Sequence, residues 1–174
     1  ITRAELLDEI LLAIAAGFET TSTALAWFIF YMSKHPHVQQ EIKRELRNNE
    51  IISTTDLALD LPDKLIYVDN VMKEVLRMAP IIDCTIRTLL KDDEFNGVKV
   101  RKDKNHNPYT LGIFGSGHRA CAGQDLARLE LKTIVTQLMQ YVTFVDRGEE
   151  KNSDGKLQGL MTAPKHIGVY IRFD

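Results

Sequence analysis

Residues 114–123 read Phe-Gly-Ser-Gly-His-Arg-Ala-Cys-Ala-Gly, and this stretch carries the strongest structural and functional signal in the chain. Its cysteine, Cys121, stands among glycines, two residues after an arginine, and a long amphipathic segment follows it. Glycines let the backbone approach a large ligand closely, and the N-terminus of a following helix favours an anionic sulfur. The stretch therefore predicts a loop that presents an ionised thiolate to a metal.

The composition around this loop is that of an ordinary globular domain. The chain has 174 residues, 44% of them hydrophobic and 26% charged, and a net charge of −2. The chain has no excess of basic residues, so its charge does not indicate a nucleic-acid partner. Its two cysteines, Cys84 and Cys121, do not make a disulfide framework. The apolar runs 10–18 and 24–32 are each shorter than the roughly twenty residues of a membrane span. We expect a soluble, intracellular chain that opens directly on a helix, without a signal peptide.

Hydrophobic periodicity places helices first and strands later. A capping box, Thr2 to Glu5, opens a helix that runs to about residue 32. Further helices are expected over 38–47, from Pro62 to Pro80 and after the cysteine loop. Strands are expected over 85–90, 141–145 and 167–173, and a tight hairpin around Asn96-Gly97 over 94–100. The predicted fold class is mainly α with small β-sheets (α+β), in one domain over residues 1–174.

The first helix carries polar groups in its middle, at Ala16-Gly17-Phe18-Glu19-Thr20-Thr21. An acid and two hydroxyls in an otherwise apolar helix are costly unless they meet a partner or water. Gly17 leaves room for something bulky against the backbone. A threonine hydroxyl that bonds to the preceding turn can open the helix locally and hold a water. The alternative is a helix bend with solvated polar groups.

Two further features involve charged residues. Glu74 and Arg77 share one helix face at i, i+3 spacing, which is typical of a structural ion pair. Arg87 follows in a predicted strand, where a lone arginine usually faces solvent.

The pattern F-x-x-G-x-R-x-C-x-G resembles the haem-binding loop of the cytochrome P450 family. Residues 16–21 resemble the family's distal helix motif, and Glu74 to Arg77 resembles its E-x-x-R helix. The three motifs stand in family order, so the chain resembles a partial cytochrome P450 fold.

The resemblance implies a role for each candidate residue. Cys121 would be the axial thiolate ligand of haem b, and Phe114 would pack near its sulfur. Arg119 and Arg87 would hold the propionates, Thr20 and Glu19 would manage protons, and Glu74 with Arg77 would be structural. The remaining candidates would contact the haem (Ala16, Gly17, Gly117, Gly123) or line the substrate pocket (Phe18, Ile81, Ile82, Leu160, Met161). For each pocket residue, ordinary core packing is the alternative.

By the same resemblance the chain would be a haem-thiolate monooxygenase. It would insert one oxygen atom of O2 into a small lipophilic substrate, with electrons from a reductase or a ferredoxin-type partner. No G-x-G-x-x-G or P-loop motif is present, so electrons must come from that partner.

Two departures from the family accompany the resemblance. Family members are more than twice as long, with much sequence before the distal helix, where an endoplasmic-reticulum anchor of a longer parent would lie. A deletion is also indicated after Val100, where a strand runs directly into a polar segment. Three alternatives stay open: a non-catalytic haem-binding fragment, a cofactor-free helical interaction module, and a zinc site (His118, Cys121, Cys84, His106).

Overall fold

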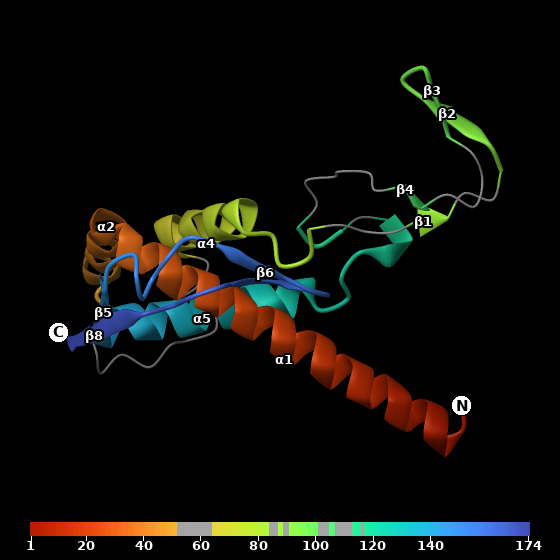
Figure 1. Ribbon diagram of the computed structural model, residues 1–174. Coiled ribbons are helices and arrows are strands. Elements are labelled where there is room, and N and C mark those ends of the chain that lie inside the picture. Colours follow the sequence, from red (N-terminus) through yellow and green to blue (C-terminus); the bar gives the residue numbers. More distant parts are fainter. Residues whose placement is uncertain (52–63, 84–86, 89–90, 101–104, 107–112, 116) are drawn as a thin grey trace.

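The computed structural model describes residues 1–51, 64–83, 87–88, 91–100, 105–106, 113–115 and 117–174. Its helices are α1 (Arg3–Lys34), α2 (Pro36–Asn48), α4 (Ile66–Met78), the short 3-10 helix η1 (Gly117–Arg119) and α5 (Gln124–Tyr141). Its strands are β1 (Arg87–Thr88), β2 (Asp93–Phe95), β3 (Val98–Val100), β4 (Asn105–His106), β5 (Val142–Asp146), β6 (Lys156–Gln158), β7 (Thr162–Pro164) and β8 (Val169–Phe173). They form two-stranded antiparallel sheets (Figure 1). The expected mainly α architecture with small sheets is confirmed.

Helix α1 begins and ends where local chemistry requires. The Thr2 hydroxyl accepts from the Glu5 amide at 3.2 Å, and the Glu5 carboxylate accepts from the Thr2 amide at 2.7 Å, so the capping box is complete. Pro36 has no amide to continue the helix and instead opens α2. The two apolar runs thus lie in one helix of 32 residues, which by length and composition alone could cross a membrane. Core helices pass the same test, and the C-terminal half of α1 is a core helix.

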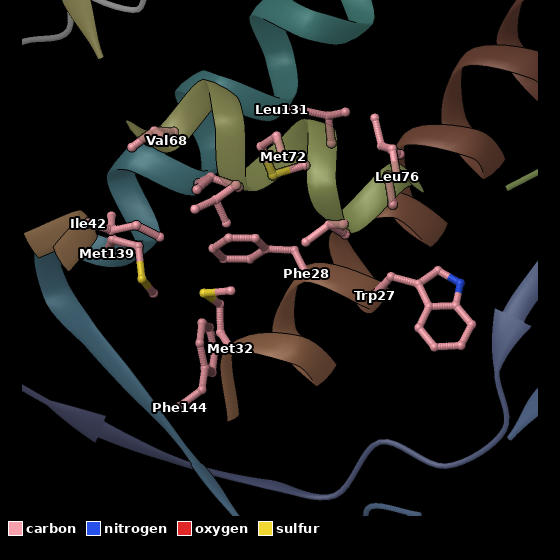
Figure 2. Packing of buried hydrophobic residues seen from close by; sticks show 14 of the residues in the cluster. Trp27, Phe28, Met32, Ile42, Val68, Met72, Leu76, Leu131, Met139 and Phe144 are labelled. Carbon is pink, nitrogen blue, oxygen red and sulfur yellow. The ribbon is translucent and has the colours of Figure 1, made fainter. Parts of the chain in front are cut away.

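The hydrophobic core lies between the C-terminal half of α1 and helices α2, α4 and α5, with β5 closing one side (Figure 2). Phe28 is fully buried at its centre. Helix α4 contributes the face expected from its periodicity: Leu65, just before the helix, with Val68, Val71, Met72, Val75 and Leu76. Pro62, expected to open this helix, lies outside the described residues.

One buried amide joins three elements of this core. The Gln39 side chain donates to the carbonyls of Met32 at 2.7 Å and Phe144 at 2.8 Å, and accepts from the Phe144 amide at 2.9 Å. Because buried backbone groups must find partners, Gln39 supplies hydrogen-bond partners to a carbonyl in the last turn of α1 and to the backbone of the middle residue of β5. Its polar group therefore belongs to the scaffold.

The strands differ in how closely they follow expectation. The hairpin β2–β3 turns at Asn96 and Gly97, which have φ of 48° and 80°, as a tight Asn-Gly turn requires. Strands β5 and β8 lie where strands were expected, over 141–145 and 167–173, and the structure pairs them with each other. Strand 85–90 is described only at β1, because 84–86 and 89–90 lie outside the described residues. Residues 101–104 and 107–112, which follow the expected deletion after Val100, also lie outside the described residues, and β4 lies between these two segments.

The hairpin β6–β7 was not expected, because its residues sit in a polar, glycine-containing stretch. Long-range contacts hold it in place: the Trp27 indole donates to the Thr162 carbonyl at 2.9 Å. The Thr162 amide in turn donates to the Ile81 carbonyl at 2.8 Å. The hairpin is thereby fixed against α1 and against the segment that follows α4.

Candidate functional site

The cysteine loop is a compact turn closed by its own backbone. The Cys121 amide donates to the Phe114 carbonyl at 2.8 Å, and the Ala120 amide donates to the Gly117 carbonyl at 3.1 Å. Gly115 and Gly117 have φ of 72° and 64°, which favours glycine at both positions. Cys121 is exposed, two residues before Gly123, the N-cap of α5. The loop therefore presents its thiol beside the N-terminal end of a helix.

The middle of α1 faces the cysteine loop across a shared cavity. The Thr20 hydroxyl donates to the Ala16 carbonyl at 2.7 Å, the bond to the preceding turn that the sequence suggested. A Cβ added at Gly17 would meet no heavy atom within 4 Å, so this stretch of helix borders open space. A small and partly polar surface thus faces the cavity in the middle of an apolar helix.

These two segments border an open cavity of about 1590 Å³. It exceeds the roughly 300–1000 Å³ of ordinary ligand pockets, and Cys121 and Arg119 line it together with Thr20. Of the residues predicted for the site, the cavity is lined by Ala16, Gly17, Phe18, Thr20, Ile81, Ile82, Phe114, Arg119, Cys121 and Gly123. Segments about one hundred residues apart in the sequence therefore meet at one site.

Other predicted residues lie elsewhere. Glu19 is exposed and does not line the cavity. Gly117 shapes the loop through its φ without reaching the cavity. Leu160 is 88% exposed, and Met161 packs partly buried against the core. The structure does not bring these two to the cavity, because the hairpin β6–β7 that they connect is fixed at Trp27.

The two arginine predictions outside the loop have different outcomes. Arg77 forms a bidentate ion pair with Glu74, with both bonds at 2.7 Å, and both side chains are more than half exposed. Its bonds lower the pKa of the Glu74 carboxyl. Arg87 lies in β1 opposite His106, and its side chain is outside what the structure describes.

Sequence reasoning missed the contribution of α5 to the cavity. Leu126 is 61% exposed and Ile134 is 37% exposed, and both line the cavity. The sequence did contain a signal for both residues, because each is a large apolar side chain outside the buried face of an amphipathic helix. Thr21, Leu25 and Glu130 line the cavity as well.

The described residues contain no group of three histidine, cysteine, aspartate or glutamate side chains that could hold a metal. Cys84, a member of the alternative zinc site, lies outside those residues. Within the described part of the chain, Cys121 is the soft metal ligand that faces the cavity.

Comparison with protein families matches this chain to the model described as cytochrome P450 over residues 1–113 and 103–171. The chain belongs to the cytochrome P450 family. Such proteins hold haem iron through a cysteine thiolate, and Cys121 lies within the second matched segment.

Individual cytochromes P450 resemble the chain over most of its length. It is 30% identical to cytochrome P450 2K3 of Oncorhynchus mykiss over 75% of the chain and 30% of that protein. It is 29% identical to human cytochrome P450 3A7 over 80% of the chain and 34% of that protein. The chain thus spans about a third of the length of these curated relatives.

Solved structures of the family share the fold. A cyanobacterial cytochrome P450, CYP120A1 with retinoic acid bound, superposes with a TM-score of 0.87 at 24% identity, over 99% of this chain and 47% of that one. A zebrafish cytochrome P450 structure with abiraterone gives a TM-score of 0.85, also at 24% identity, over 100% of this chain and 48% of that one. At this identity the likeness establishes the arrangement of helices and strands.

Proposed function

We propose that this chain is the haem-binding part of a monooxygenase that inserts one oxygen atom of O2 into a small lipophilic substrate. The observation that carries the proposal is the cavity itself, where an exposed cysteine faces the Ala16, Gly17 and Thr20 surface of α1. A reductase or ferredoxin-type protein would supply the electrons. The intracellular location expected from the sequence stays a prediction.

The residues at the cavity fit haem b. Cys121 would supply the thiolate ligand, and Arg119 would supply a guanidinium suited to a propionate. The open space at Gly17 allows a flat macrocycle close to the helix backbone. Bound there, haem would supply the activation of dioxygen. Arg87 would take the second propionate.

The protein's own contribution centres on Thr20. Its hydroxyl proton is committed to the Ala16 carbonyl. The hydroxyl oxygen therefore keeps lone pairs that can accept a hydrogen bond from a water in the cavity. Thr20 would hold that water beside the substrate as a proton source. Glu19, which faces away from the cavity, would act only through solvent.

The first test is the ferrous-CO difference spectrum of the haem-supplemented chain beside Cys121→Ser. A strongly red-shifted Soret band that the variant loses would support the thiolate site. Absence of the band in the unmodified chain would contradict the proposal.

The second test addresses Thr20 with a matched pair of variants. Thr20→Ala should uncouple oxygen consumption from product formation, whereas Thr20→Ser, which keeps the hydroxyl, should stay coupled. Equal coupling in an active preparation would remove the role from Thr20.

A second candidate function is haem binding without turnover. It is favoured by the exposure of the site, where Phe18 on the cavity wall is 72% exposed. Catalysis needs a site that excludes water. A normal CO spectrum without substrate turnover would favour this candidate, and a folded chain that binds no haem would leave the cofactor-free helical module.

We also propose that a segment is deleted after Val100. Two features support this: the family match falls into two segments that meet at residues 103–113, and alignment to cytochrome P450 4c21 of Blattella germanica extends over 206 positions against 174 residues. Sequencing the transcript across Val100 tests it: extra codons between Val100 and Arg101 would support a lost segment, and a transcript that joins these two codons directly would contradict loss of a segment from this chain's own message.

A further inference from the structure

A second, smaller hollow lies between α4, α5 and residues 113–115. Its volume is about 230 Å³, and its apolar lining includes Met72, Leu76 and Leu131, each no more than 6% exposed. Phe114 and Gly115, with Leu76, Ile113 and Leu131, line both this hollow and the large cavity, whereas Met72, Lys73, Arg128 and Lys132 line only the hollow. The smaller hollow is thus adjacent to the cysteine loop and has walls of its own on α4 and α5.

Three cationic side chains line the hollow together with one carboxylate. Asp69 pairs with Lys73 at 2.5 Å and with Lys132 at 3.5 Å. The Lys132 side chain is only 15% exposed. The Arg128 guanidinium lies 5.2 Å from the centre of the Phe114 ring, and within the described ranges no carboxylate pairs with it. The lining therefore carries a net charge of +2.

The ionisation of Asp69 does not reduce this excess. Burial would raise the pKa of its carboxyl, but the ammonium groups of Lys73 and Lys132 outweigh burial and lower the pKa. Asp69 is therefore ionised at neutral pH and is already shared between two lysines. Lys132 in particular is a largely buried cation with one partner at the limit of an ion pair, and an added anion would improve its environment.

We propose that this hollow binds an amphipathic organic anion, with a carboxylate on a short apolar body. The carboxylate would lie between Lys132 and Arg128, and the apolar body would cover Met72, Leu76 and Leu131. An inorganic anion would leave that apolar surface in water, and a neutral apolar molecule would leave the cations unpaired.

Occupancy of the hollow would be felt at the cysteine loop. Phe114 lines the hollow together with Arg128, whose guanidinium lies over its ring, and the Phe114 carbonyl accepts a hydrogen bond from the Cys121 amide. A ligand that moves Arg128 or the ring should therefore change the environment of that amide. This link makes the amide resonance of Cys121 a local reporter.

The experiment titrates the 174-residue chain with 4-phenylbutyrate and with its neutral match, 4-phenylbutyramide, by calorimetry and by amide NMR. The anion should bind about tenfold more tightly, because charge-assisted hydrogen bonds contribute more than neutral ones. It should also shift the Cys121 amide resonance. Equal affinities for the two compounds, or no binding at millimolar concentration, would overturn the proposal.

Two variants should change the affinity for the anion in opposite directions and thereby identify the site. Lys132→Met should weaken binding about fivefold, whereas Asp69→Asn, which frees both lysines, should tighten it about threefold. If the Asp69 network acted only structurally, both variants would weaken binding, and this outcome would contradict the proposal. Arg128→Gln, at an exposed position, provides the same test as Lys132→Met if the latter does not fold.

Two controls exclude other binding places. Arg119→Gln changes the large cavity and should leave the affinity unchanged. Lys151→Met, at an exposed residue beyond β5, should also have no effect. Dependence on Arg119 without dependence on Lys132 or Arg128 would move the anion into the large cavity and overturn the assignment.

Discussion

The two halves of α1 have similar apolar residues and opposite environments (Figure 1). Phe18 is 72% exposed, whereas Phe28, less than three turns further along, is fully buried. The N-terminal half extends from the rest of the structure with its leucines and isoleucines half exposed, and the C-terminal half is packed against α4, α5 and β5. Apolar composition therefore does not separate the part of a helix that stabilises a domain from the part that borders a binding cavity.

The difference follows from what each half faces. Around Phe28, side chains from α2, α4, α5 and β5 and from α1 itself fill the space (Figure 2). Around Gly17 the facing space is the large cavity. We infer that folding free energy is concentrated in the C-terminal half and that ligand binding falls to the N-terminal half.

The largest effect on the free energy of unfolding is expected from comparing one substitution in each half of α1. Phe28→Ala should lower the free energy of unfolding by about 3–5 kcal/mol, because it leaves a void in a packed core. Phe18→Ala should change it by less than about 0.5 kcal/mol. Urea denaturation followed by circular dichroism measures both, and comparable losses would break the comparison.

A smaller loss of stability is expected at Gln39, whose buried side chain joins α1, α2 and β5. Gln39→Leu should lower the free energy of unfolding by about 2–3 kcal/mol, because the carbonyls of Met32 and Phe144 and the Phe144 amide lose their partner. Its neighbour Gln40 is exposed, so Gln40→Leu is the matched control and should be close to neutral. A neutral Gln39→Leu would mean that water replaces the amide.

The buried end of α1 should also respond to pH through Asp146. Bonds from Asn152, Lys34 and the Gly148 amide lower the pKa of this carboxyl. A lowered folded-state pKa contributes stability that is present above the unfolded value of about 3.8 and is lost as pH falls through the folded value.

Stability should therefore decline as pH drops below about 5, and Asp146→Asn should flatten that decline. The expected difference is of the order of 1 kcal/mol or less, because the side chain is one third exposed. Urea midpoints across the acid range, with Asp154→Asn as an exposed control, measure it. If the urea midpoints of the Asp146 variant and the unmodified chain fell in parallel with pH, the Asp146 carboxyl would not be a source of the pH dependence.

The smallest effect is expected at the exposed ion pair on α4. Glu74→Gln and Arg77→Gln should each leave the urea midpoint within replicate error, because both side chains are solvated. A clear loss in either variant would mean that the pair contacts residues outside the described ranges. It would then belong with the buried half in the comparison.

Local signals predicted much of this fold. The capping box at Thr2, the buried face of α4 and the Asn96-Gly97 turn each depend on neighbours within one or two turns of the chain. The hairpin β6–β7 does not, because its strands have three residues each and depend on Trp27 and Ile81. Asn152 was missed for the same reason: it lies in a polar stretch, yet bonds to Ser33 across the fold bury it completely.

The candidate site divides in the same way. The loop around Cys121 and the surface around Thr20 were predictable, because glycine placement and a mid-helix hydroxyl are local features. That Leu126 and Ile134 of α5 share their cavity, while Leu160 stays in solvent, depends on how helices and hairpin pack. Spacing along a single sequence does not contain that information.

Trp27, the only tryptophan in the chain, is buried in the C-terminal half of α1 next to Phe28, where its indole donates to the Thr162 carbonyl and the Lys156 ammonium lies 5.9 Å from its ring centre. The molecule therefore has a built-in optical reporter. Its emission should shift to the red when the β6–β7 hairpin detaches, and energy transfer should quench it when a haem enters the nearby cavity. One fluorescence trace can thus distinguish loss of the scaffold from filling of the site without any added label.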